Sequence, residues 1–261
     1  MGLRHITLQP LRPWQSIVFT AAPALVAYFA MWTLAPSFKA HTGQPFLVGY
    51  LISWLASEAV ILSAAVIAYR VERRTPGWRE MLERYRLRSP TRGDLGWALI
   101  TVTVMVATYF ALSSTSRWLA QSWAFSPHPA FPAELRPGAE QAIVPGVFME
   151  MQLKGVWWVL IVYLLGWVLN IAGEELWFRG FMLPRQEVTH GKVGWLVNGI
   201  CFTLFHIMWK WNLIALLPGS LFLSYATQRR RNTWTAILAH GLLNLTTAVA
   251  IAAGVAGIGA A

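Results

Sequence analysis

Residues 155–183 read GVWWVLIVYLLGWVLNIAGEELWFRGFML. No charged side chain occurs before Glu174, and about 20 such residues are enough to cross a lipid bilayer as one helix. Three ionisable residues, Glu174, Glu175 and Arg179, then follow before the apolar stretch ends. The segment therefore predicts a membrane-spanning helix that carries charges near one end.

The composition of the whole chain also indicates a membrane protein. Of its 261 residues, 56% are hydrophobic and only 12% are charged, and the mean hydropathy is +0.47. Soluble domains carry about 25% charged residues, so this chain lacks the polar surface that water requires. Its 15 tryptophans fit the aromatic belts that form at bilayer interfaces.

Seven stretches are long and apolar enough to predict spanning helices. They cover approximately 15–35, 46–69, 95–113, 155–183, 193–209, 211–227 and 233–256. The predicted fold class is therefore an all-α, polytopic membrane bundle of about seven transmembrane helices, forming a single integral membrane domain over 1–261. An eighth or re-entrant segment within 114–154 is the alternative, but the prolines and polar residues there favour a loop.

The distribution of basic residues predicts the orientation of the bundle. If the N-terminus is cytoplasmic, the inside segments hold 15 Lys and Arg residues and the outside segments hold five. We therefore expect a cytoplasmic N-terminus and a basic cytoplasmic loop at 70–94. The compact size and the lack of an evident organelle signal favour a bacterial inner membrane. The net charge of +10 does not indicate a nucleic-acid partner, because the basic residues lie in short segments between apolar runs.

Ionisable groups inside hydrocarbon are costly, so those in the predicted helices are candidates for function. Glu175 and Arg179 are one helical turn apart and can pair, whereas Glu174 points away from Arg179 and stays available for chemistry. The plainer interpretation of the two glutamates is a buried ion-pair network that fixes helix packing.

Two further polar groups lie in later helices, and each alone is weak evidence. His206 follows Phe202 by four residues, and Asn244 follows His240 by four. A helix rises about 1.5 Å per residue. Glu174, His206, His240 and Asn244 therefore lie roughly 13–20 Å along their helices from basic residues at the same predicted membrane face. This agreement in depth predicts that they surround one buried, water-reachable site.

The three motifs, in this order, resemble those of the CPBP family, also called the Abi family, which includes the CAAX prenyl endopeptidases. They are Glu-Glu-x-x-x-Arg, Phe-x-x-x-His and His-x-x-x-Asn, and the resemblance covers about 155–250. The matching positions are Glu174, Glu175, Arg179, Phe202, His206, His240 and Asn244.

The resemblance implies an intramembrane endopeptidase that hydrolyses a peptide bond near the C-terminus or the membrane-proximal part of its substrate. Glu174 with His206 would activate water, and His240 and Asn244 would donate hydrogen bonds to the oxyanion. Glu175, Arg179 and Phe202 would support the site. The implied partners are the bilayer and a membrane protein or peptide, such as a prenylated protein, a sorting signal or a bacteriocin-like peptide.

Several alternatives remain open at the level of sequence. Glu174, His206 and His240 could ligate a catalytic zinc ion, although the chain has no His-Glu-x-x-His motif and a metal-free glutamate mechanism is favoured. The chain could instead be an inactive scaffold of the family fold. A proton-coupled transporter is the third alternative, in which Glu58 could join a relay; for the peptidase we place Glu58 outside the site.

Overall fold

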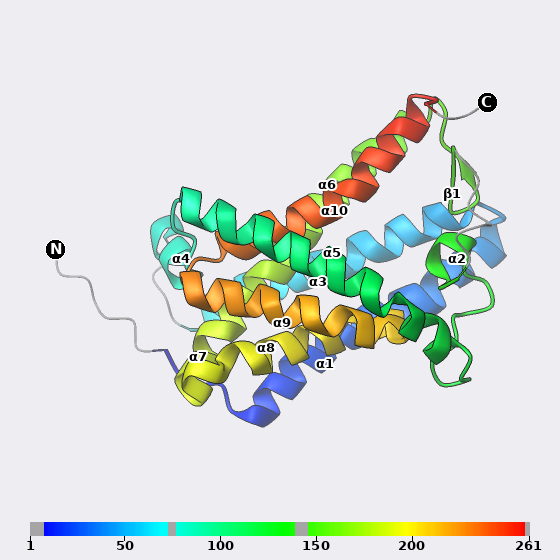
Figure 1. Ribbon diagram of the computed structural model, residues 1–261. Coiled ribbons are helices and arrows are strands. Elements are labelled where there is room, and N and C mark those ends of the chain that lie inside the picture. The colour runs from blue at the N-terminus through cyan, green and yellow to red at the C-terminus, as the bar shows by residue number, and fades with distance from the viewer. Residues whose placement is uncertain (1–7, 73–76, 139–145, 259–261) are drawn as a thin grey trace.

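A computed structural model describes residues 8–72, 77–138 and 146–258. The described chain is mostly helical, as predicted, with loops between the helices (Figure 1). The exception is a short antiparallel ribbon, β1 (Val147–Phe148) paired with β2 (Met151–Gln152). The structure is therefore an all-α membrane fold with one small hairpin.

The first half of the chain supplies three long helical runs and a short helix. The bounds are α1 (Pro13–Phe29), continued through a π-helical turn (Ala30–Leu34) into α2 (Ala35–Thr42), then α3 (Phe46–Val71), α4 (Trp78–Arg84) and α5 (Arg92–Ala120). The predicted loop 114–154 begins later than expected, because α5 continues to Ala120. In the described part of that loop the only helix is the 3₁₀ turn Ala133–Leu135; residues 139–145 lie outside the described ranges.

The second half carries the three motifs on a series of shorter elements. The bounds are α6 (Trp157–Glu175), a π-helical segment (Leu176–Met182), α7 (Leu183–His190), a 3₁₀ turn (Gly191–Val193), α8 (Gly194–Phe205), a 3₁₀ segment (His206–Asn212), α9 (Leu213–Arg230) and α10 (Trp234–Val255).

The helices confirm a multi-pass membrane protein, but they do not confirm the count of seven spans. Five helical tracts in the described residues are long and apolar enough to cross a membrane: Pro13–Thr42, Phe46–Val71, Arg92–Ala120, Trp157–Arg230 and Trp234–Val255. The expected spans 155–183, 193–209 and 211–227 all fall inside the 74-residue tract Trp157–Arg230. Within it, the 12 residues of α8 rise only about 18 Å, which is less than the roughly 30 Å of a hydrocarbon core.

The outer faces of the helices are apolar, as lipid contact requires. Large hydrophobic side chains such as Phe110 and Ile161 are 72% and 67% exposed. A water-soluble fold would bury such residues, whereas a bilayer solvates them.

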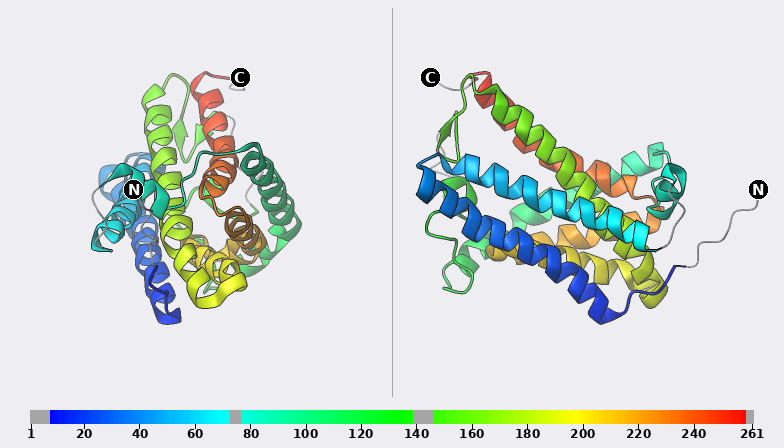
Figure 2. Two further views of the ribbon diagram at one scale, coloured as in Figure 1. Left: turned by 90° about the vertical axis from the view of Figure 1, so that its left-hand side faces the viewer. Right: turned by 180° about the vertical axis from the view of Figure 1, so that it is seen from behind.

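Segments expected on the same side of the membrane lie together at the ends of the bundle (Figures 1 and 2). At the expected cytoplasmic end, the Leu11 N–H donates to the Arg185 carbonyl, and Arg86 pairs with Glu187 at 2.7 Å. At the opposite end, Lys39 pairs with Glu150. Which end faces the cytosol stays a prediction. The predicted basic loop 70–94 contains α4, and its residues 73–76 lie outside the described ranges.

Helix α6 carries the first motif and packs between α3 and α10. The close approach of α3 depends on Gly173, where an added Cβ would lie 3.2 Å from the Glu58 carbonyl oxygen and 3.3 Å from the Leu62 nitrogen. These are backbone atoms that cannot move aside. Gly173 therefore sets the contact of α3 with α6 immediately beside Glu174.

Candidate active site

The structure brings residues of all three motifs into the interior of the bundle. Glu174 and Glu175 end α6, and they are 3% and 0% exposed; Arg179 in the following π-helical segment is also fully buried. On α10, His240 is buried and Asn244 half-buried. π-Helical turns inside helices occur often at functional sites, and this seven-residue π segment separates the glutamates from α7.

Glu175 joins the first motif to the third. Its Oε1 accepts a hydrogen bond from Arg179 Nη1 at 3.2 Å and lies 2.8 Å from His240 Nδ1. Because a carboxylate oxygen only accepts, the proton on this side of the imidazole lies on Nδ1 and His240 donates it. The predicted pairing of Glu175 with Arg179 is thus present, and His240 is oriented by the same oxygen.

Asn170, which is not part of the three motifs, connects Glu174 to the rest of the cluster by hydrogen bonds. Asn170 Nδ2 donates to Glu174 Oε1 at 2.5 Å and to Glu58 Oε1 at 3.1 Å. Asn244 Nδ2 donates to Asn170 Oδ1 at 3.0 Å and lies 3.1 Å from His240 Nε2. One unbroken hydrogen-bonded line therefore connects Glu58 on α3, Asn170 and Glu174 on α6, and Asn244 and His240 on α10.

Glu58 is the main difference between the site expected from sequence and the site observed. The sequence places it outside the peptidase site, yet it shares a donor with Glu174 and is only 4% exposed. The physical reason is the approach of α3 to α6 at Gly173. A weak sequence signal existed, because a glutamate within a predicted span is costly unless it has a partner.

His206 joins the cluster through aromatic contacts. Its Nδ1 donates to the Phe202 carbonyl oxygen at 2.8 Å, which leaves Nε2 as its basic nitrogen. The Phe202 ring lies 4.7 Å from the His206 ring and 6.0 Å from the His240 ring, and the Arg179 guanidinium carbon stands 3.7 Å from its centroid. Among the described contacts, no hydrogen bond joins His206 to Glu174. Phe202 thus packs the two histidines and Arg179 around one ring.

Behind Arg179 the polar network continues across four more helices. Arg179 Nη2 lies 3.5 Å from Ser224 Oγ, which donates to Asn198 Oδ1 at 2.9 Å. Asn198 donates to Gln186, and Gln186 donates to Ser16 on α1. Sequence reasoning missed this chain, although polar residues on apolar helices commonly join them.

Several buried atoms in the cluster have no hydrogen-bond partner among the described residues. They are Oε2 of Glu58, Oε2 of Glu174, Oε2 of Glu175 and Nε of Arg179. A buried polar atom left without a partner costs about 1–3 kcal/mol. The free oxygen of Glu174 is therefore a strong potential acceptor for a water molecule or a substrate group.

The geometry of the cluster does not meet the requirements of a zinc site. In the described residues, no three His, Cys, Asp or Glu side chains gather in a way that could hold a metal ion. His240 uses Nδ1 toward Glu175 and Nε2 toward Asn244, so neither of its ring nitrogens faces Glu174 and His206 as a free ligand. The arrangement does not fit the three-ligand site, and no step below depends on a metal.

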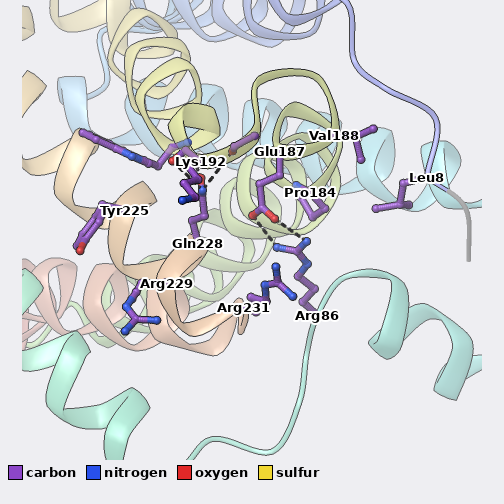
Figure 3. A pocket seen from close by; sticks show the side chains of 12 residues that line it. Leu8, Arg86, Pro184, Glu187, Val188, Lys192, Tyr225, Gln228, Arg229 and Arg231 are labelled. Carbon is purple, nitrogen blue, oxygen red and sulfur yellow. Dashed lines mark hydrogen bonds and ion pairs between the residues drawn. The ribbon is translucent and has the colours of Figure 1, made fainter.

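A cavity of about 670 Å³ lies at the expected cytoplasmic end of the bundle, and no motif residue lines it (Figure 3). It is therefore separate from the cluster around Glu174.

Comparison with known proteins agrees with the motif series. Residues 156–246 match the family model described as type II CAAX prenyl endopeptidase Rce1-like. No curated protein and no solved structure shows a significant match. The matched segment contains all seven motif residues, whereas Glu58 lies before it. This match over residues 156–246 supports the CPBP, or CAAX protease, family, a family of membrane proteases.

Proposed function

We propose that the protein is an intramembrane endopeptidase that hydrolyses a peptide bond near the C-terminus or the membrane-proximal part of a protein or peptide. The observation that carries the proposal is the hydrogen-bonded line from Glu174 through Asn170 and Asn244 to His240 and Glu175. It joins the first and third motifs in one buried cluster, and Phe202 packs the second motif against them. Polar groups that served only separate helix contacts would not need to meet.

In the proposed reaction, Glu174 acts as the general base. Its free Oε2 accepts a hydrogen bond from a water molecule and takes one proton as the water oxygen attacks the scissile carbonyl carbon. The tetrahedral intermediate collapses by breaking the C–N bond. The proton passes to the leaving nitrogen, directly from Glu174 or through Nε2 of His206, and the products are a carboxylic acid and an amine.

Asn244 serves as an oxyanion donor in this proposal, and His240 serves as the second donor once it is protonated on Nε2, because its Nδ1–H already donates to Glu175. Both N–H groups of Asn244 are already directed at acceptors, Asn170 Oδ1 and His240 Nε2. The substrate oxygen must therefore replace one of these acceptors, which makes the oxyanion contact form only when substrate binds. Such donors commonly contribute a factor of about 100–1,000 to kcat.

Glu175, Arg179 and Phe202 orient these groups. The Glu175 carboxylate fixes the His240 ring, and Arg179 balances the charge of Glu175 and stacks on Phe202. None of the three needs to touch the reacting atoms.

The expected partners and location belong to the same proposal. The substrate is a membrane-associated protein or peptide, such as a prenylated protein, a sorting-signal protein or a bacteriocin-like peptide. The protein is proposed to lie in a bacterial inner membrane with its N-terminus in the cytoplasm. No metal cofactor is required.

A second function deserves a test, because Glu58 and Glu174 share a donor deep in the bundle. Two buried carboxylates beside one amide are also what a proton-coupled transporter would use. An inactive scaffold is the remaining alternative. The transporter is expected to move protons without cleaving any peptide, and the scaffold to do neither.

The deciding experiment uses the full chain in proteoliposomes with two quenched fluorescent peptides, one with a prenylated CAAX C-terminus and one with an unprenylated apolar C-terminus. We expect cleavage of at least one peptide by the wild type. Glu174→Gln should lower kcat by about 100–10,000-fold, while Glu83→Gln, an exposed site on α4, should leave it unchanged. Equal cleavage by wild type and Glu174→Gln would remove Glu174 from the chemistry. A pH-sensitive dye inside the vesicles tests proton movement in the same samples.

A further inference from the structure

The cavity at the expected cytoplasmic end of the bundle carries an excess of positive charge (Figure 3). It has a volume of about 670 Å³, within the range of small-ligand sites. Four basic side chains line it, Arg86, Lys192, Arg229 and Arg231, against one acidic side chain, Glu187.

Only one of these four basic groups is neutralised by an ion pair among the described residues. Arg86 donates to both oxygens of Glu187, at 2.7 and 2.8 Å. Lys192, Arg229 and Arg231 are exposed and have no ion pair among the described residues. The cavity therefore presents three uncompensated cations.

The run Arg229–Arg231 does not behave as a uniformly solvated basic segment. The middle residue, Arg230, turns away and bonds to Asp94 at 2.9 Å, which fixes the end of α9 to the start of α5. The two flanking arginines line the cavity instead. Arg230 therefore connects the two helices, whereas Arg229 and Arg231 line the cavity.

Two of the basic residues that line the cavity have a strained backbone. Arg86 and Arg231 have φ angles of +54° and +51° and are two of the four non-glycine residues in the described ranges with positive φ. Arg231 ends α9 in the left-handed conformation, a position that glycine normally occupies because it has no Cβ. A cation at a helix C-terminus gains from the helix dipole, but glycine would meet the left-handed backbone of this position without strain.

The aromatic and apolar residues that line the cavity are typical of the depth at which lipid headgroups lie. The rings of Trp195 and Tyr225 stand 5.6 Å apart at the cavity, and tryptophan and tyrosine concentrate at membrane interfaces. Leu8 and Val188 add an apolar edge on the far side from Arg229 (Figure 3). Guanidinium groups bind phosphate through paired N–H donors.

We propose that this cavity binds a phosphate group, held by Arg229, Arg231 and Lys192, of an anionic phospholipid headgroup or of a soluble phosphate ester. The site is separate from the proposed active site, and its occupancy does not depend on peptidase activity.

The test measures ligand retention by the purified full chain in neutral detergent, using native mass spectrometry. One arm adds phosphatidylglycerol or, for comparison, phosphatidylcholine; the other adds glycerol phosphate. The variant Arg229→Gln/Arg231→Gly removes two cations, and its glycine relieves the left-handed strain at 231. The control Arg88→Gln/Arg92→Gln removes the same charge from exposed positions at the same end that do not line the cavity.

We expect the wild type to retain phosphatidylglycerol over phosphatidylcholine. The cavity variant should lose at least about tenfold in affinity, since two charge-assisted hydrogen-bonding groups are gone, with a melting temperature equal to or above that of the wild type. The control should stay within about threefold, as expected for exposed charges. Retention of the lipid but not of glycerol phosphate assigns the lipid, and the reverse assigns the soluble ester. Retention of neither, or an equal loss in the control, would overturn the proposal.

Discussion

Glu58 and Glu174 lie on different helices and accept hydrogen bonds from the same side-chain amide, that of Asn170, at 3.1 and 2.5 Å. Asn170 therefore stands between the proposed base and a carboxylate from outside the segment that matches the family. Its own carbonyl oxygen accepts from Asn244, so one amide sets the relative positions of residues on three helices.

Replacing Asn170 by Ala should misplace Glu174 without removing any group that touches the substrate. We expect kcat to fall by about 10–100-fold, because a shift of roughly 1 Å in a catalytic group has this order of effect, while KM changes little. Glu58→Ala should act in the same direction, and Glu58→Gln should restore most of kcat because its amide oxygen still accepts from Asn170. Ser57→Ala, the neighbouring buried polar position on α3, is the matched control. An Asn170→Ala enzyme with wild-type kcat would contradict the positioning role.

Glu175→Gln should destabilise the protein as well as inactivate it. The substitution leaves the fully buried Arg179 without its counter-charge, and breaking a buried ion pair from one side costs about 3–5 kcal/mol. The double variant Glu175→Gln/Arg179→Met removes both charges, so it should recover part of the stability but none of the activity. Thermal unfolding in detergent measures the first effect and peptide cleavage the second. If the double variant is no more stable than the single one, the charge argument is wrong.

Asn244→Asp should be more harmful to catalysis than its small change in size indicates. The asparagine amide donates hydrogen bonds, whereas an aspartate carboxylate only accepts them. The carboxylate would therefore repel Asn170 Oδ1 and an incoming oxyanion. We expect Asn244→Ala to lower kcat by about 100–1,000-fold and Asn244→Asp to lower it at least as much. Steady-state kinetics with the better peptide checks this, and a change confined to KM would argue against an oxyanion role.

Gly173→Ala should separate α3 from α6. The new Cβ would lie 3.2 Å from the Glu58 carbonyl oxygen, and such overpacking costs about 1–3 kcal/mol. Because the Glu58–Asn170 contact depends on this approach, kcat should fall together with the melting temperature. Gly96→Ala on α5 is the control: its Cβ would meet nothing within 4 Å, so stability should stay the same or rise by up to about 1 kcal/mol. Equal behaviour of the two variants would show that the close approach is unimportant.

Chelation tests the zinc alternative directly. Because the donor atoms of Glu174, His206 and His240 do not gather as a metal site, cleavage should persist after dialysis against a strong chelator. The metal content of the same sample shows whether the chelator has removed all of the metal. Loss of activity with the metal, restored by adding zinc, would establish the metal mechanism instead.

The sequence alone indicated the class of protein and the family that the match over residues 156–246 supports. Runs of apolar residues predict membrane helices because every helix that crosses the bilayer needs about 20 of them. The order of the motifs identified the family, and the one-turn spacing of Glu175 and Arg179 predicted their pairing, since both residues lie on one helix.

Tertiary structure decided which helices face each other and with what rotation. Asn170, Ser224 and Asn198 carry no sequence signal, and the sequence does not show which partner Glu58 has; their roles follow from packing contacts such as that of α3 with Gly173. The number of spans also depended on packing, because α8 and α9 are joined through a kink at Trp209 and pack against each other. Spacing along a chain fixes neighbours within a helix, but only the three-dimensional arrangement brings together polar atoms that are more than 100 residues apart.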